Sequence, residues 1–546
     1  MPQETPTLKE PPSLELVLKR NSVERLKREK SPLVMVDELP ALIGMGYADV
    51  PEEDIVRLKW WGLYHDKPKV GTFMLRIKLA AGRLTPAQVR AIGALSVTHG
   101  KSEAELTTRQ NVQLHNIRLA ALPQVMDALH DAGLTSLGGC GDAVRAITGC
   151  PACGIAHDEL FDVSDVLQEA HDFFTGHPDY VDLPRKHKIS IGACADRCWA
   201  PEINCISLVG VRGPGGEEGF AVLVGGGLSS VPRVARDLGV FVPKEQAIPV
   251  LRALLDAWKE DLRYRLSRVK ARMKFMVDDY GAEGMREKVE RRLGHPLRGY
   301  ALEPLDREPT EHLGVQPQKQ EGLTTIGVPV HVGLVSGEQL LQLADLAESL
   351  DAEVRVTRQQ NFLLANVPDR AVEQVVSRLE DLGFPLRPGI RGSSIACTGE
   401  PHCNYSVTET KTRLDGLIEH LEGRFGDDVS PLRLHLDGCP HACAQHWVGD
   451  LGFQGTSVRD EAGARRQAFD VYLRGALGPR AAIARPVFRR VPSEDLDDLV
   501  ESLIAGWLDR RDDGQSFRDF CDQTSDDELG ALTGREPARA RGREAA

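Results

Sequence analysis

The sequence lacks any long apolar run. No stretch of about 18 apolar residues occurs, which is the length that a membrane-spanning helix needs. The N-terminus, MPQETPTLKE, has no apolar core of the kind found in a signal peptide. A surplus of basic residues is also absent, because the net charge is −13. These absences predict a cytoplasmic protein that binds neither a membrane nor nucleic acid.

Two features that are present are the length of the chain and its cysteine residues. At 546 residues the chain is too long for one hydrophobic core, so several domains are expected. In a reducing cytoplasm its 11 cysteines are not expected to form disulfides. The cysteine content therefore favours metal binding or catalysis.

The sequence also repeats itself. Residues 73–133 follow the apolar periodicity of a β-α-β-α module, and residues 328–384 follow the same order. The letters TRQN of the first module have an echo in TRQQN of the second, which places Arg358 opposite Arg109. We interpret the chain as two diverged halves of a duplication.

A second matching stretch supports this interpretation. The stretch 183–210 resembles the stretch 432–455, with a constant offset of 245 residues where the two overlap, and this alignment places Cys194 and Cys198 on Cys439 and Cys443. The sequence therefore predicts an α+β protein of three domains with pseudo-twofold symmetry.

Four cysteines form a pair of pairs. Cys397 and Cys403 enclose five residues, whereas Cys439 and Cys443 enclose three. Four thiolates are the usual ligands of a [4Fe–4S] cluster. Structural zinc sites more often space their cysteines by two to four residues, so zinc fits less well. Zinc and buried cysteines without a metal remain the alternatives on spacing alone.

The motifs around these cysteines resemble those of the siroheme-dependent sulfite and nitrite reductases. CTG-x-x-x-C followed by GCP-x-x-C resembles the cluster signature of that family, and TTRQNVQLH, VRAITGCP and LPRKHK resemble its other landmarks in the same order. The resemblance covers about residues 60–515. It implies that the four cysteines ligate a [4Fe–4S] cluster and that Cys443 also bridges the cluster to siroheme.

The resemblance also implies ferredoxin-like half-domains, with siroheme and the cluster at the interface between the halves. The expected boundaries are an N-terminal arm (1–70), a first half-domain (71–150), a first siroheme-reductase domain (151–321), a second half-domain (322–393), a second siroheme-reductase domain with the cluster ligands (394–515), and a C-terminal tail (516–546).

A basic pocket is the next implication of the resemblance. Siroheme carries carboxylates and the substrate is an oxyanion, so the site needs cations. The residues that match the substrate pocket of the family are Arg76, Arg145, Lys186 and Lys188. The residues expected to hold the siroheme are Thr107, Arg109, Gln113, Arg185 and Cys443. A strand would point Lys186 and Lys188 to one face and Arg185 to the other.

The predicted function is the six-electron reduction of sulfite to sulfide by a monomer. Because no flavin or nicotinamide motif is present, reduced ferredoxin is the expected electron donor. Lys188 favours sulfite, since nitrite enzymes of the family tend to have asparagine there, but CTG at Cys397 and Gln445 resemble nitrite reductases. Nitrite reductase is therefore the first alternative, and precorrin-3B synthase or a non-enzymatic metal-binding or electron-transfer protein is a more distant one.

Further cysteines lie in the first half. Alignment of the halves places Cys153 on Cys403 and Ile147 on Cys397, so that Cys153, Cys194 and Cys198 retain sulfur at ligand positions. We expect buried relics of the duplication here, with a second metal site, to which Cys150 could also belong, as the alternative. Family members with a Tyr–Cys pair near the active site suggest a covalent link between Tyr64 and Cys140, with ordinary packing as the alternative.

Two segments carry predictions about surface structure. Residues 255–295 are helical by pattern and rich in basic residues, which predicts a solvated face or a docking site for an acidic partner. The tail from about Asp526 is predicted to be disordered.

Overall fold

The computed structural model describes residues 10–387 and 389–538, which form two compact units. Unit 1 holds the described residues up to Gly227 together with Arg233–Val328 and Leu334–Leu386. Unit 2 holds Leu228–Pro232, Pro329–Gly333 and the described residues from Arg387 onward. No helix in these described ranges is long and apolar enough to cross a membrane.

Short helices build the start of unit 1: α1 (Leu14–Arg20), α2 (Ser22–Glu29), α3 (Leu39–Met45) and α4 (Glu52–Leu58). Polar caps begin the first two, because Ser13 and Asn21 accept hydrogen bonds from backbone N–H groups of the first turns. The buried indole of Trp60 donates to the carbonyl of Val181 at 2.7 Å. The described part of the expected N-terminal arm is therefore folded onto the rest of unit 1.

Unit 1 contains two ferredoxin-like sheets. In spatial order, the first consists of β1 (Leu63–His65), β2 (Thr72–Ile77), β5 (Val112–Arg118), β4 (Glu103–Leu106) and β13 (Leu334–Ser336). The second consists of β11 (Gly314–Pro317), β12 (Leu323–Val328), β15 (Phe362–Pro368), β14 (Glu353–Val356) and β3 (Arg83–Leu84). The helices of these modules are α5 (Pro86–His99), α6 (Leu122–Asp131), α10 (Gly337–Leu350) and α11 (Val372–Asp381).

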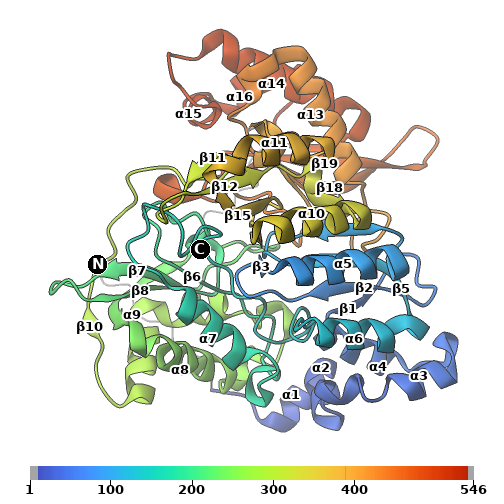
Figure 1. The fold of residues 1–546 in the computed structure, drawn as a ribbon, viewed down its shortest axis with the longest axis vertical. Coiled ribbons are helices and arrows are strands. Elements are labelled where there is room, and N and C mark those ends of the chain that lie inside the picture. Colours follow the sequence, from blue (N-terminus) through green and yellow to red (C-terminus); the bar gives the residue numbers. More distant parts are fainter. Residues whose placement is uncertain (1–9, 388, 539–546) are drawn as a thin grey trace. The chain divides into compact units, whose positions relative to one another are not determined.

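The two modules exchange an edge strand. β13 belongs to the second module by sequence but pairs with β4 of the first, and β3 of the first pairs with β14 of the second. α5 and α10, which follow the exchanged strands, lie side by side (Figure 1). The two modules therefore interlock, and pseudo-twofold symmetry relates one to the other.

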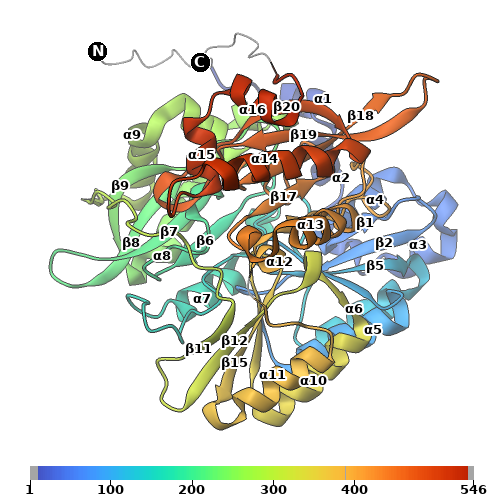
Figure 2. The same cartoon turned by 90° about the horizontal axis from the view of Figure 1, so that it is seen from above.

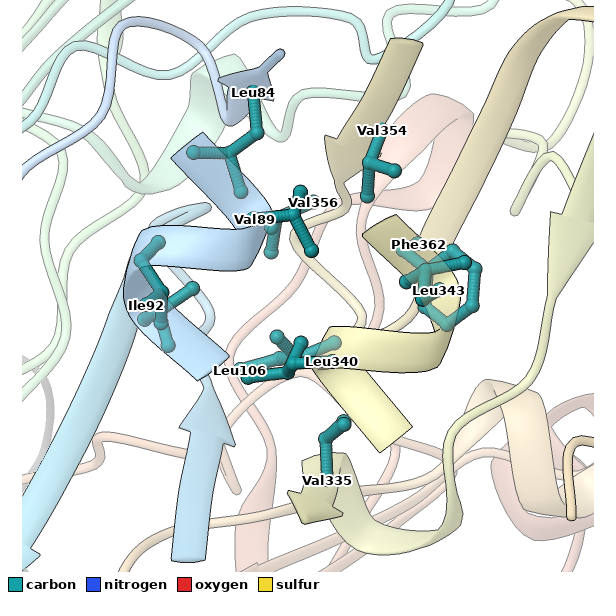
Figure 3. A pocket seen from close by; sticks show the side chains of 11 residues that line it. Leu84, Val89, Ile92, Leu106, Val335, Leu340, Leu343, Val354, Val356 and Phe362 are labelled. Carbon is teal, nitrogen blue, oxygen red and sulfur yellow. The ribbon is translucent and has the colours of Figure 1, made fainter. Parts of the chain in front are cut away.

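Apolar side chains fill the seam between these helices. Val89 and Ile92 of α5 face Leu340 and Leu343 of α10 across a cavity of about 10 Å³ (Figure 3). A space of this size is no larger than about one water molecule, so the seam is packed core and not a ligand site.

Hydrogen bonds across the symmetry axis fix the register of the repeat. The side chain of Gln110 donates to the carbonyl of Val356 at 3.1 Å, and that of Gln360 donates to the carbonyl of Leu106 at 2.9 Å. The turns that carry them match as well, since the backbone N–H of Thr107 donates to Asn111 and that of Thr357 donates to Asn361. Gln110 and Gln360 are therefore equivalent positions.

This register corrects one equivalence between the repeats that was predicted from sequence similarity alone. With Gln110 equivalent to Gln360, Arg109 is equivalent to Gln359, and Arg358 is equivalent to Thr108. The expected equivalence of Arg109 and Arg358 was wrong by one residue, because similar letters occur at neighbouring places in the two turns.

Each half also has a larger sheet that begins with parallel strands. Unit 1 holds β6 (Ile189–Gly192), β7 (Ile206–Arg212), β8 (Glu218–Val224), β9 (Arg236–Pro243) and β10 (Arg298–Gly299), with α7 (Ser164–Phe174), α8 (Ala247–Lys259) and α9 (Met273–Leu293). Unit 2 holds β16 (Ile395–Ala396), β17 (Leu434–Asp437), β18 (Leu451–Arg459), β19 (Arg465–Leu473) and β20 (Arg485–Pro492). Its helices are α12 (Ile390–Ser393), α13 (Lys411–Phe425), α14 (Leu496–Arg510), α15 (Phe517–Gln523) and α16 (Asp526–Thr533). Of these, α13 and α14 pack on the sheet of unit 2 (Figure 2).

The ladders of these two sheets correct a second alignment. Thr148 forms a parallel bridge to Ser190 in unit 1, and Ile395 pairs in parallel with His435 in unit 2. Two residues beyond each bridge stand Cys150 and Cys397. Cys150, and not Ile147, therefore occupies the position equivalent to Cys397.

Two predictions about surface segments were wrong in part. Arg265, Arg272 and Lys274, in the segment expected to be a solvated basic face, are buried. The tail contains α16, which begins at a capping box and buries Leu529, so the predicted disorder does not hold for Asp526–Thr533. The last part of the predicted tail, residues 539–546, lies outside the described residues.

Candidate functional site

The predicted cluster cysteines of unit 2 follow two neighbouring parallel strands. Cys397 directly follows β16, and Cys439 lies just beyond the end of β17. The backbone N–H of Gly438 donates to the Sγ of Cys397 at 3.2 Å, which joins the two loops. Within the first loop, the backbone N–H of Cys403 donates to the carbonyl of Gly399 at 2.8 Å. Because parallel strands end at the same edge, both loops reach one place.

A buried carboxylate orders the second loop. Asp437 at the end of β17 accepts hydrogen bonds from the backbone N–H groups of Ala444 at 2.7 Å and His446 at 3.2 Å. It also lies 2.9 Å from the Nδ1 of His446. Asp437 was not among the predicted site residues, although an acidic residue at the end of an apolar strand before GCP is a visible signal. The loop carrying Cys439 and Cys443 is therefore held in place by the protein itself.

The thiols of this group oppose each other's ionisation. Burial raises the pKa of Cys439 to about 12, and the neighbouring Cys443 adds to the effect. Burial also holds the pKa of Cys397 well above its usual value, with further contributions from Asp437 and Cys443. Convergent thiolates need a cation to offset this cost. A set of four sulfur donors fits a [4Fe–4S] cluster, and by donor type alone it also fits zinc.

Two of the predicted pocket arginines of unit 1 meet at one turn. Arg145 donates to the carbonyls of Gly139 at 2.9 Å and Gly141 at 2.7 Å. Arg76 of β2 donates from Nε to the side chain of Gln113 at 2.8 Å and from Nη1 to the Sγ of Cys140 at 3.3 Å. The structure thus brings Arg76, Arg145 and Gln113 together around residues 139–141.

Tyr64 belongs to the same neighbourhood. Burial raises the pKa of its phenol to about 12, an adjacent Cys140 raises it further, and Arg145 and Arg76 oppose the shift. The two residues of the suggested Tyr–Cys pair are therefore close enough to affect each other electrostatically. A covalent link between them stays a prediction.

Arg109 and Thr107 are engaged in holding backbone. Arg109 donates to Asn204 at 2.9 Å and to the carbonyls of Ile189, at 3.1 Å, and Ala146. Burial lowers the pKa of its guanidinium to about 9. The hydroxyl of Thr107 accepts the backbone N–H of Asn111 at 3.1 Å. In this structure both residues support the turn and the strand ends beside Arg76 and Arg145.

The LPRKHK segment leads into β6 and is not itself a strand, apart from an isolated parallel bridge between His187 and Val144. His187 is fully buried and packs on Trp258 with ring centroids 5.1 Å apart, whereas Lys186 and Lys188 are half-buried. Arg185 pairs with the buried Asp142 at 3.2 Å. That the two lysines point to one face stays a prediction.

Lys78 is a buried amine that the sequence analysis missed. Its ammonium donates to the hydroxyl of Thr175 at 2.8 Å and to the carbonyl of Val144 at 3.3 Å. Burial lowers its pKa to about 7, and the positive charges of Arg145 and Arg109 add to the shift. The signal for it was present, because Arg76 and Lys78 interrupt an otherwise apolar strand at alternate positions.

Unsatisfied donors show that this group suits an anion. The Nε atoms of Arg109, Arg145 and Arg272 are buried, and among the described residues they have no hydrogen-bond partner. Buried donors of this kind carry a desolvation cost that a carboxylate or oxyanion would offset. We call these side chains, Arg76, Lys78, Arg109, Arg145 and Arg272, the basic group of unit 1. The basic group therefore fits a polycarboxylate cofactor, a small oxyanion, or both.

Comparison with known families assigns most of the chain. Residues 65–132 and 316–382 match the family described as "Nitrite/Sulfite reductase ferredoxin-like half domain". Residues 140–297 match the family described as "Nitrite and sulphite reductase 4Fe-4S domain". The second match falls on the first half and not on the segment that contains Cys397–Cys443.

Individual relatives cover nearly the whole chain. "Sulfite reductase [ferredoxin] 2" of Mycolicibacterium paratuberculosis is 34% identical over 93% of this chain and 96% of its own. "Ferredoxin--nitrite reductase" of Synechococcus elongatus is 34% identical over 89% of this chain and 96% of its own. The solved structure of the Mycobacterium tuberculosis NirA protein superposes with a TM-score of 0.88 at 32% identity, over 93% of this chain and 97% of that one. The predicted α+β fold with ferredoxin-like half-domains is confirmed.

Proposed function

Because the chain belongs to the nitrite and sulfite reductase family, we propose that it reduces sulfite to sulfide with electrons from reduced ferredoxin. One observation supports sulfite over nitrite: Lys186 and Lys188 are both half-buried on either side of the buried His187, so a second ammonium stands where nitrite enzymes tend to have a neutral amide. A doubly charged sulfite gains more from this charge than singly charged nitrite does.

Family membership confirms that the protein is an oxidoreductase with siroheme and a [4Fe–4S] cluster. When bound, these groups supply the electrons and the metal at which the anion reacts. Cys397, Cys403, Cys439 and Cys443 are our proposed cluster ligands, with Cys443 also proposed as the link to siroheme. The siroheme carboxylates are assigned to the basic group of unit 1.

The remaining chemistry falls to the side chains of unit 1. The guanidiniums of Arg76 and Arg145 are oriented by the turn at residues 139–141 and offer forked donors to an oxyanion. Lys186 and Lys188 are proposed to polarise the oxygens and to deliver protons as the oxygens leave. Lys78, which donates to the carbonyl of Val144 next to Arg145 and whose pKa burial lowers to about 7, is a further candidate proton donor beside these arginines.

Nitrite is the second candidate, and a specific observation favours it. The nitrite reductase of Synechococcus elongatus matches this chain at the same 34% identity as the sulfite reductase of Mycolicibacterium paratuberculosis. Residues beside the cluster loops, CTG at Cys397 and Gln445, also resemble nitrite reductases. The substrate therefore has to be decided by rates.

The deciding experiment measures kcat/KM for sulfite and for nitrite with reduced ferredoxin as donor. We expect the ratio to favour sulfite and to fall about tenfold in Lys188→Asn, which is the effect of about 1.4 kcal/mol in the transition state. Lys186→Gln is the matched control, because it also removes an ammonium but should lower both rates together. A wild-type preference for nitrite, or an unchanged ratio in Lys188→Asn, would make the sulfite proposal wrong.

The monomeric state and the cytoplasmic location stay predictions. Size-exclusion chromatography with light scattering on the full chain tests the first, and a mass near the 59.9 kDa of one chain is expected.

A further inference from the structure

The first repeat has a cysteine group of its own. Cys150 stands where Cys397 stands in the second repeat, and Cys194 and Cys198 align with Cys439 and Cys443. All three of these cysteines are buried. No function described so far uses them.

These thiols lie at distances that suit a metal ion. The sulfurs of Cys194 and Cys198 are 3.5 Å apart, and the sulfur of Cys150 is 3.7 Å from the Nε2 of His312. The ligand atoms of Cys150, Cys198 and His312 all lie within 4.8 Å of one another. In a tetrahedral zinc site the bond lengths place two sulfurs about 3.8 Å apart and a sulfur and a nitrogen about 3.5 Å apart. The spacing of the group is therefore that of a metal site.

His312 takes the role that a fourth cysteine has in the second repeat. It lies in the segment between β10 and β11 and is buried, with its backbone in the left-handed region at φ 56°. That conformation costs a non-glycine residue about 1–2 kcal/mol, so tertiary contacts must hold it. One such contact is the hydroxyl of Thr310, which accepts the backbone N–H of His312 at 3.3 Å.

Asp196 joins the two segments that carry these ligands. Its carboxylate accepts the backbone N–H of Thr310 at 2.8 Å and that of Cys198 at 3.3 Å. It also accepts the thiol of Cys194 at 2.9 Å. The Cys194 contact is given up when that thiol loses its proton to bind the ion, whereas the two backbone hydrogen bonds remain and keep the ligand-bearing segments together.

Arginines from the second ferredoxin-like module hold the cysteine loops from outside. Arg355 donates to the carbonyls of Pro151 at 3.0 Å and Cys153 at 2.8 Å. Arg358 donates to the carbonyl of Cys198 at 3.0 Å. The loops are therefore fixed without a metal, and the ordering cost of binding is low.

The donor types of the group favour a soft dication. Sulfur and imidazole donors select zinc over magnesium or calcium.

We propose that Cys150, Cys194, Cys198 and His312 bind a structural zinc ion. Binding displaces the protons that the ligands hold, so that three thiolates and the neutral imidazole surround the ion. The site has no open position and ties the segment between the two repeats to the first sheet. A cavity of about 170 Å³, lined by Cys194, Arg197 and Tyr300 among others, gives metal an access route.

Metal analysis of the purified holoenzyme tests this proposal. Mass spectrometry of the metals should find about one zinc ion per chain beside the iron of siroheme and the cluster. X-ray absorption at the zinc edge should show three sulfurs and one nitrogen. Wild-type protein that holds no zinc after purification in zinc-supplemented buffer would overturn the proposal, as would extra iron in place of zinc.

Variants locate the ion. Cys198→Ser and His312→Ala should lose zinc while siroheme absorption and iron content remain. Cys153→Ser is the matched control, because Cys153 is a buried first-repeat cysteine whose sulfur contacts Asp162 and Ser164 instead of the group. Zinc that persists in both ligand variants, or that is lost in Cys153→Ser, contradicts the assignment. If a ligand variant fails to fold, zinc release from wild-type protein by a mercurial, followed with a chromogenic chelator, decides the presence of the ion.

Discussion

The cysteine groups of the two repeats have equivalent backbone positions but different ligand side chains. Each lies at the end of parallel strands, at Thr148 and Ser190 in the first repeat and at Ile395 and His435 in the second. The second repeat completes its set with a fourth cysteine from the same loop, whereas the first meets a histidine from a distant segment. The difference teaches that a duplicated strand edge can be kept while its donors change.

The basic group shows the opposite asymmetry. Arg76 pairs with Gln113 in the first sheet, and at the equivalent place in the second sheet Gly327 pairs with Leu363. Gly327 could not carry a side chain, because a Cβ there would lie 1.7 Å from the carbonyl oxygen of His312. In our proposal the cations for the anion therefore come from the first repeat, and the four thiols for the cluster come from the second.

The largest expected effect separates the two cysteine groups. Cys439→Ser should lose iron and lower activity at least about 100-fold, more than the loss of a merely supporting contact. Cys194→Ser, at the equivalent position of the first repeat, should keep its iron and instead lower the thermal midpoint. Iron analysis and ferredoxin-linked rates check both variants, with Cys153→Ser as the control. Equal iron loss in both would show that the two groups do not have separate roles.

A change in the basic group should come next in size. Arg145→Met removes a forked donor and should lower kcat/KM for the anion about 100-fold, as loss of one oxyanion donor typically does. Steady-state rates measure it, and siroheme absorption confirms that the cofactor is retained. Arg83→Met is the control, since Arg83 binds Cys153 and Ser164 away from the turn at residues 139–141. An equal loss in the control variant would assign the effect of Arg145 to folding.

The third prediction concerns pH. Burial alone would lower the pKa of His115, but Glu105 and Asp66 outweigh it and raise the pKa from 6.5 to about 9. Because the folded-state pKa lies above the unfolded value, this stabilisation is complete below pH 6.5 and is lost as the pH rises through about 9. Urea unfolding should show a loss on the order of 3 kcal/mol over that range.

The second repeat provides the control for this pH effect. Ala365 occupies the position equivalent to His115, so no titrating partner exists there. His115→Gln should therefore flatten the pH dependence of unfolding between pH 6.5 and about 9. A variant with the slope of wild type would assign the pH dependence to other groups.

The smallest effect tests the seam between the modules. A Cβ added at Gly93 of α5 would lie 3.0 Å from the carbonyl oxygen of Gly337 in α10. Gly93→Ala should therefore lower the free energy of unfolding by about 1 kcal/mol. Gly416→Ala in α13, where a Cβ meets open space, should raise it by about 0.5–1 kcal/mol. Denaturant midpoints measure both, and a gain in Gly93→Ala would mean that the seam is loose.

Much of the candidate site could be predicted from the sequence because its signals are local. Cys397, Cys403, Cys439 and Cys443 are separated by a few residues within each loop, and Lys186 and Lys188 belong to one short motif. Asp437 and Lys78 were missed, since an isolated charge in an apolar strand gains meaning only from the groups it contacts.

The sequence by itself determined the duplication, the family and the residue types of the cofactor site. Only the tertiary structure decided the exchange of β3 and β13, the equivalence of Cys150 with Cys397, and the approach of His312 to Cys150. The physical reason is that hydrogen-bond ladders between distant segments set the register, and similar letters do not. Cys150 and His312 are 162 residues apart in the chain, and no local pattern links them.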